Sequence, residues 1–138
     1  MVRVSKIDWR WAAALLGPLP LLSWIPPWGG DVIQLGMHDA VLYCVSIAIF
    51  EELLFRGALQ GSLLRSRFFQ VKWLALSKAN WLTSLMFALA HLWQHPWFLW
   101  LGYFAVSLLF GDFRERYRSV LAPVSLHGYY NLLLLWRP

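Results

Sequence analysis

The amino-acid sequence predicts an all-α fold, a polytopic transmembrane helical bundle with about five spanning helices in one integral membrane domain, residues 1–138. Hydrophobic residues make up 59% of the chain and charged residues 14%, against about 45–50% and about 25% in typical soluble proteins. The mean hydropathy is +0.52. Because a small soluble domain buries only part of its surface, it could not hide this much apolar area. A bilayer is therefore the expected solvent.

Apolar stretches of nearly spanning length divide the chain. A spanning helix needs about 20 mostly apolar residues. The stretches that approach this length lie at about residues 9–28, 40–64, 79–94, 97–110 and 119–136. We expect the first to be an uncleaved anchor helix, kinked at Pro18 and Pro20, and the third to end before Pro96. The third and fourth are short, which indicates tilt or a locally thin bilayer.

The positive charges alternate between connections, as a five-span topology requires. Those that five spans would place on one side of the membrane are Arg3, Lys6, Arg10, Arg65, Arg67, Lys72, Lys78, Arg114, Arg116 and Arg118. The positive-inside rule makes this side, with the N-terminus, cytoplasmic. We expect an integral protein of a prokaryotic plasma (inner) membrane. Because the charges form no contiguous basic face interleaved with aromatic residues, nucleic acid is not an expected partner.

Three charged residues, Glu51, Glu52 and Arg56, lie inside the second predicted span. Each ionised group at membrane depth costs a few kcal/mol or more, so they must be paired and face the protein interior. Glu52 and Arg56 are four residues apart and share a helical face, which predicts an ion pair. Glu51 points about 100° away from Glu52 and has no partner on its own helix. One carboxylate is thus predicted to be tied to arginine and the other to be available for chemistry.

Further polar residues lie at a similar predicted depth on two other spans. His91 lies on the third, and His127 and Asn131 lie four residues apart on the fifth. At about 1.5 Å per residue from the cytoplasmic helix ends, these residues and Glu51 lie roughly 12–20 Å deep. Three spans therefore offer carboxylate, imidazole and amide groups to one layer of the membrane.

The order and spacing of these residues resemble the CPBP family of intramembrane proteases, also called the CAAX-protease or Abi family. That family is marked by Glu-Glu-x-x-x-Arg, Phe-x-x-x-His and His-x-x-x-Asn motifs. All three are complete here, in Glu51-Glu52 with Arg56, in Phe87 with His91 and in His127 with Asn131. The resemblance covers about residues 40–136, which would be the protease core.

The resemblance implies an intramembrane endopeptidase without a cofactor or metal. Glu51 and His91 would hold and deprotonate a water, and His127 and Asn131 would donate hydrogen bonds to the oxyanion. Glu52 would be a supporting residue, as would Arg56, which could instead meet the substrate. The expected partners are the lipid bilayer and a membrane-tethered protein or peptide substrate. The short chain also leaves room for a homo-oligomer or a partner protein.

Two other functions fit the same residues. Glu51, His91 and His127 could hold a zinc ion in a membrane hydrolase with an open fourth position. A non-enzymatic protein, such as a proton relay, an immunity protein or a scaffold, could use the polar cluster structurally. The remaining His and Cys residues are expected to lie outside the site: His95 at the membrane interface, His38 in solvent and Cys44 in the core.

Overall fold

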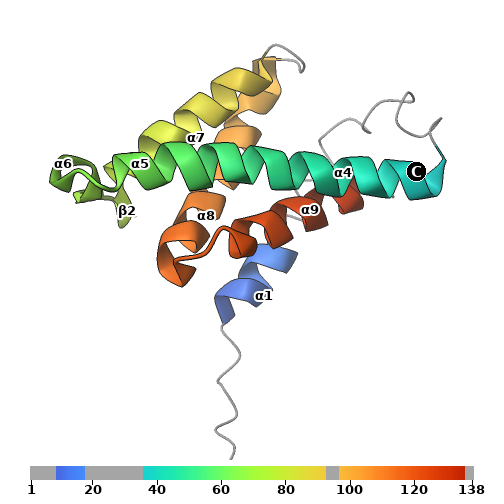
Figure 1. Cartoon of the computed structure of the whole chain (residues 1–138), viewed down its shortest axis with the longest axis horizontal. Coiled ribbons are helices and arrows are strands. Elements are labelled where there is room, and N and C mark those ends of the chain that lie inside the picture. Colours follow the sequence, from blue (N-terminus) through green and yellow to red (C-terminus); the bar gives the residue numbers. More distant parts are fainter. Residues whose placement is uncertain (1–8, 18–35, 93–96, 136–138) are drawn as a thin grey trace, which may run out of the picture.

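A computed structural model of the chain describes residues 9–17, 36–92 and 97–135, and these are mostly helical (Figure 1). The elements are α1 (Trp9–Leu16), α4 (Met37–Glu52), a π-helical stretch η1 (Leu53–Gln60), α5 (Gly61–Leu63), α6 (Arg67–Gln70), β1 (Lys72–Trp73), β2 (Leu76–Ser77), α7 (Lys78–His91), a short 3₁₀ turn η2 (Trp97–Leu99), α8 (Trp100–Tyr117) and α9 (Leu121–Leu135). A helix thus lies in each of the five predicted stretches. None of the helices in the described part of the chain combines the length and apolar composition needed to cross a membrane.

The fourth helix does not end where the sequence predicted. It continues to Tyr117 instead of stopping near residue 110, so Arg114 and Arg116 lie on α8 and not in a connection. Arg116 pairs with Asp112 on the same helix at 3.2 Å, whereas Arg114 Nε donates to the backbone carbonyl of Arg56 on η1 at 3.3 Å. Pro18, Pro20 and the rest of the first stretch after residue 17 lie outside the described residues, as do His95 and Pro96.

A single long rod, formed by α4, η1 and α5, crosses the molecule (Figure 1). Every fourth residue along it is buried, in the series Ala40, Cys44, Ala48, Glu52, Arg56 and Gln60. In a regular α-helix such a series winds around the axis, because four residues exceed one turn. A π-turn contains more residues than an α-turn. The π-helical stretch therefore rotates the later side chains back toward the bundle interior.

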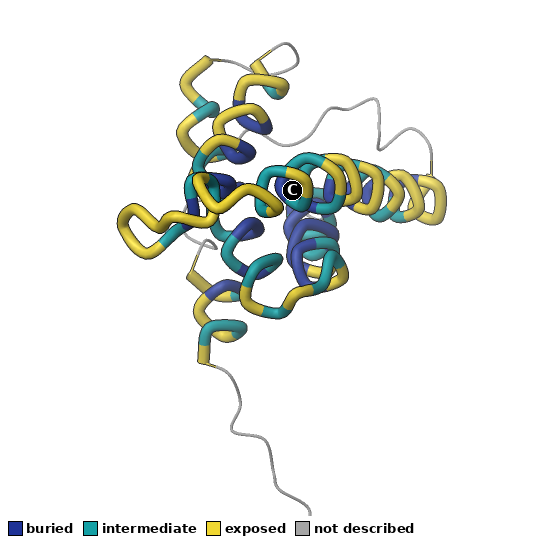
Figure 2. The backbone as a smooth tube through the Cα atoms, turned by 60° about the vertical axis from the view of Figure 1, so that its left-hand side comes forward, coloured by how far each residue is buried: buried dark blue, intermediate teal, exposed yellow. Residues whose placement is uncertain are grey.

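The remaining helices pack around this rod. Helix α7 packs against α8, and α9 packs against both α4 and α8. The main hydrophobic cluster lies between α8, α9 and α1, and includes Phe110, Phe113, Leu126, Tyr130 and Ala14. Figure 2 shows buried residues on the facing sides of these helices and exposed residues along the outer side of the rod. The interior of the bundle is therefore where η1, α7, α8 and α9 meet.

Candidate active site

The π-helical stretch places Arg56 in a fully enclosed setting. Its Nε lies 3.4 Å from Glu52 Oε2, and both side chains are 0% exposed. Nη2 donates to the hydroxyl of Ser107 on α8 at 2.7 Å and to the backbone carbonyl of the same residue at 3.1 Å. The guanidinium lies over the rings of Phe87 (5.1 Å) and Phe110 (5.8 Å). The predicted ion pair is present, and Arg56 presents no exposed surface to a substrate.

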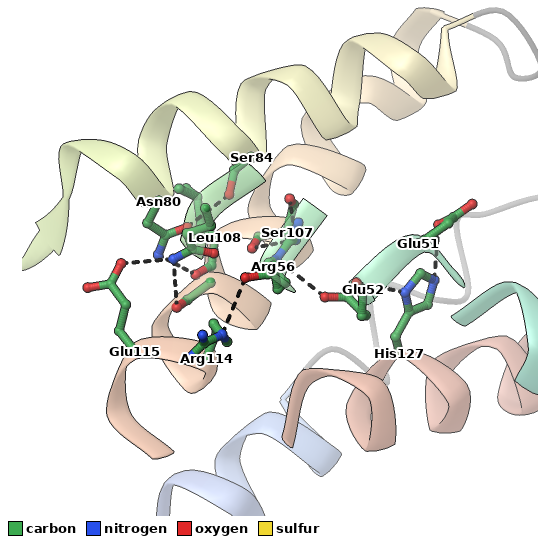
Figure 3. Close-up of polar contacts among 12 residues, drawn as sticks. Glu51, Glu52, Arg56, Asn80, Ser84, Ser107, Leu108, Arg114, Glu115 and His127 are labelled. Carbon is green, nitrogen blue, oxygen red and sulfur yellow. Dashed lines mark hydrogen bonds and ion pairs between the residues drawn. The ribbon is translucent and has the colours of Figure 1, made fainter. Parts of the chain in front are cut away.

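Glu52 connects this buried pair to α9. Its Oε1 lies 2.9 Å from His127 Nδ1, and Figure 3 shows Glu52 between Arg56 and His127. The Glu52 carboxylate is paired with the Arg56 guanidinium, so it accepts the hydrogen bond from His127. The proton of a neutral His127 ring is therefore on Nδ1, and the lone pair of Nε2 points away from Glu52.

His91 is oriented in the same way on α7. Its Nδ1 lies 2.8 Å from the backbone carbonyl of Phe87, one turn earlier. A carbonyl oxygen only accepts, so Nδ1 must donate. The imidazole ring stacks on Tyr103 of α8 at 4.5 Å between centroids. These backbone and aromatic contacts fix the orientation of the His91 ring, with Nδ1 bonded to the Phe87 carbonyl and Nε2 on the side of Glu51.

Glu51 lies opposite both Nε2 atoms. Its Oε2 is 3.8 Å from His91 Nε2 and 3.7 Å from His127 Nε2. The side chain is 23% exposed, whereas that of Glu52 is 0% exposed. Both distances are longer than a direct hydrogen bond. At such distances a bridging water has to be considered. The Glu51 carboxylate on α4 therefore lies within 3.8 Å of imidazole nitrogens from two other helices, α7 and α9.

Asn131, the fourth predicted catalytic residue, lies one turn beyond His127 on α9. Its amide nitrogen donates to the backbone carbonyl of Cys44 on α4 at 3.2 Å. One of its two N–H groups is therefore engaged, and the side chain is 6% exposed. The structure brings Glu51, His91 and His127 together. Asn131 shares α9 with His127 and contacts α4 through the Cys44 carbonyl.

Comparison with known proteins identifies the family of the chain. Residues 34–133 match the family described as type II CAAX prenyl endopeptidase Rce1-like. The chain belongs to this Rce1-like family. The match confirms the resemblance seen in the three motifs and spans every side chain of the site. No curated protein and no solved structure matches the chain.

The structure describes two of the three His and Cys residues that the sequence predicted to lie outside the site. His38 is 84% exposed and pairs with the neighbouring Asp39. Cys44 is buried, as expected of a core residue, and its carbonyl rather than its thiol contacts Asn131. His95 lies outside the described residues. Within the described ranges, no group of three or more His, Cys, Asp or Glu residues is arranged to hold a metal ion.

Sequence reasoning missed several residues that support the Rce1-like site. Ser107 binds Arg56, and Gln60 donates to the Gly111 carbonyl at 3.2 Å and to Glu115 at 2.8 Å. The fourfold spacing of Glu52, Arg56 and Gln60 was visible in the sequence as a polar series within an apolar stretch. Ser107 carried no comparable signal, because a lone serine in an apolar helix is common in membrane proteins.

Proposed function

We propose that the chain is an intramembrane endopeptidase that hydrolyses a peptide bond of a membrane-tethered protein or peptide with a water activated by Glu51 and His91. The observation that carries the proposal is the position of Glu51 Oε2, 3.8 Å and 3.7 Å from two imidazole nitrogens. A water held by Glu51 and His91 would donate one O–H to each of them, which leaves its lone pairs free to attack a substrate carbonyl carbon. Membership of an endopeptidase family supports this reading.

The proton balance of the reaction assigns roles to Glu51, Asn131 and His127, while His91 positions the water. Glu51 takes a proton from the water as its oxygen attacks the carbonyl carbon, and this proton passes to the leaving amine when the tetrahedral intermediate breaks down. The second N–H of Asn131 would donate to the oxyanion. His127 Nε2 can join it only after receiving a proton, because its Nδ1–H is committed to Glu52. Glu52 and Arg56 are supporting groups in this scheme, with no direct contact to the substrate.

A membrane setting is supported by the exposed apolar side chains. On the rod these are Leu42, Tyr43, Ile49, Phe50, Leu53 and Leu54, and on α7 they are Leu82, Leu85, Met86 and Leu89. Continuous exposed apolar surfaces of this kind mark contact with lipid or with another protein. We propose that the chain is a polytopic membrane protein with five spans, a cytoplasmic N-terminus and a location in a prokaryotic plasma membrane.

The first test measures cleavage by the purified full chain in vesicles. The substrates are a peptide tethered by one transmembrane segment and a peptide tethered by a C-terminal prenyl group, each with a fluorescent reporter. We expect Glu51→Gln to lower the rate about 10²–10⁴-fold, because the general base is lost. Asp39→Asn is the matched control, since Asp39 is an exposed carboxylate on the same helix, and its rate should equal that of the parent chain.

Two outcomes would decide against the proposal. If a chelator abolishes cleavage and zinc restores it, the alternative of a zinc hydrolase that uses Glu51, His91 and His127 is correct. If the parent chain cleaves neither tethered peptide while the folded protein is present, the polar cluster has a non-enzymatic role, such as a proton relay.

A further inference from the structure

The hairpin between α6 and α7 has a strained tip. Strands β1 and β2 pair antiparallel, with Trp73 opposite Leu76, so Leu74 and Ala75 alone form the turn. Both have positive φ angles, 49° and 69°. Two-residue turns with this geometry normally use Asn, Asp or Gly, because other side chains clash with the backbone there. Leu74 is nevertheless 69% exposed. Leu74 is thus a large apolar residue that points outward from a turn whose backbone conformation is unfavourable for it.

The segment around this tip combines exposed apolar and basic side chains. Over residues 65–78, which we name the interface segment, Phe68, Val71, Trp73 and Leu74 are exposed by 51–69%. The same segment carries Arg65, Arg67, Lys72 and Lys78 and no acidic residue. Such a mixture is typical of elements that lie in the headgroup region of an anionic leaflet.

The interface segment is firmly attached to the bundle. Trp81 Nε1 on α7 donates to the Trp73 carbonyl at 3.0 Å, and the two indole rings lie 4.9 Å apart. The backbone N–H of Lys78 donates to the Val71 carbonyl at 2.9 Å, and its ammonium lies 3.9 Å from the Phe68 ring centroid. The exposed tip therefore keeps a fixed direction relative to α7.

We propose that the interface segment is a membrane anchor that binds the headgroups of anionic phospholipids and inserts Leu74 into the bilayer. The inference rests on the membrane location proposed above. A short connection between two spans begins and ends at the bilayer surface, so its exposed side chains face headgroups before they can meet any soluble partner. The four positive charges outnumber the Glu115 carboxylate of α8, which accepts a hydrogen bond from Ser77 of the segment. This excess of positive charge complements an anionic leaflet, and the strained turn directs an apolar side chain into it. Figure 1 shows this segment at one end of the rod, next to α5.

The first experiment measures the depth of spin labels in the full chain, in a Cys44→Ala background and in vesicles that contain phosphatidylglycerol. A label at Leu74→Cys should be shielded from a water-soluble nickel chelate and accessible to oxygen. A label at Arg118→Cys, in the exposed connection before α9, should show the opposite. Equal chelate access at both positions would refute the anchor.

A label at Phe50→Cys separates this inference from the membrane proposal, because Phe50 is 69% exposed on the apolar side of α4. If the Phe50 label is shielded and the Leu74 label is not, only the anchor is wrong. If both are accessible to the chelate, the membrane location itself is wrong, and the anchor fails with it.

The second experiment measures the preference for spin-labelled phosphatidylglycerol over phosphatidylcholine. Arg67→Gln with Lys72→Gln should lower this preference by up to about fivefold for each charge removed. The matched control, Arg116→Gln with Arg118→Gln, removes the same charge from outside the segment and should leave most of the preference. Equal losses in the two variants would mean that net charge, and not the segment, attracts the lipid.

The third experiment uses a variant that should fold better. Leu74→Asn with Ala75→Gly supplies the residues that the turn geometry favours, so we expect a higher Tm in detergent. The same variant removes the inserted side chain, so a label at Val71→Cys should become more accessible to the chelate. A lower Tm, or unchanged shielding of Val71, would contradict the role assigned to the strained tip.

Discussion

Glu51 and Glu52 are adjacent in sequence but occupy different environments. The Glu52 carboxylate is fully buried between Arg56 and His127, whereas the Glu51 carboxylate is 23% exposed and faces two imidazole nitrogens at 3.7–3.8 Å. Successive residues of a helix point about 100° apart, which separates the two carboxylates onto different surfaces. The same residue type can therefore stabilise the fold at one position and be available for chemistry at the next.

Replacement of Glu52 should destabilise the protein far more than replacement of Glu51. In Glu52→Ala, Arg56 becomes a buried charge without its carboxylate, which costs about 3–5 kcal/mol. Glu51→Gln removes no such buried partner and should unfold within about 1 kcal/mol of the parent chain. Thermal or denaturant unfolding in detergent measures both. Equal stability of the two variants would show that the glutamates do not differ in the way their burial indicates.

At the scale of the element, α7 and α8 are joined by the side chain of Asn80, which leaves no room for a side chain at Gly111. Asn80 on α7 donates to the Leu108 carbonyl at 3.0 Å and accepts from Ser84. A Cβ atom at Gly111 on α8 would lie 2.0 Å from Asn80 Oδ1. The glycine is thus required for the close approach of α7 to α8, which in turn sets His91 opposite Glu51.

Gly111→Ala should therefore be strongly destabilising. Either α8 moves away from α7 or Asn80 loses its hydrogen bonds, and overpacking of this kind typically costs about 1–3 kcal/mol. Gly102→Ala on the same helix is the control, because a Cβ there meets nothing within 4 Å. Unfolding in denaturant, compared for the two alanine variants, measures the difference. An equally small effect at both positions would mean that the two helices can separate at little cost.

At the scale of the molecule, α1 belongs to the same folded unit as the Rce1-like region although it lies outside residues 34–133. Its Trp11 packs edge-on against Phe113 of α8 with a centroid distance of 4.8 Å. The Tyr130 hydroxyl on α9 donates to the Ala14 carbonyl. These contacts join α1 to the cluster that also supports His127 through Phe110, whose ring stacks on the imidazole.

Loss of Trp11 should therefore weaken the whole bundle. We expect Trp11→Ala to lower the stability by about 2–4 kcal/mol, toward the range seen for buried aromatic residues. Trp9→Ala is the matched control, because Trp9 is 68% exposed and its removal should change little. Tm values in detergent, together with amide exchange in α9, report the effect. If α9 exchanges at the same rate in both variants, α1 is not coupled to the site-bearing helix.

Much of this arrangement follows from the sequence because it depends on local spacing. Apolar length predicted the helices, since backbone groups in an apolar environment must be paired within a segment. Four-residue spacing predicted the Glu52–Arg56 pair, because such residues are neighbours on one helix. The three motifs likewise identified the family and, on three separate stretches, the side chains that face one another.

Other features depend on how elements far apart in the chain pack, which local spacing does not determine. The extension of α8 beyond residue 110 brings Arg114 to the Arg56 carbonyl on η1 and Glu115 to Gln60, two contacts across the bundle. The hydrogen bond from His127 to Glu52, which selects the ring nitrogen that faces Glu51, joins residues 75 positions apart. The sequence by itself determined which groups are available. The tertiary structure alone decided which of their atoms face one another, because orientation is set by contacts between helices.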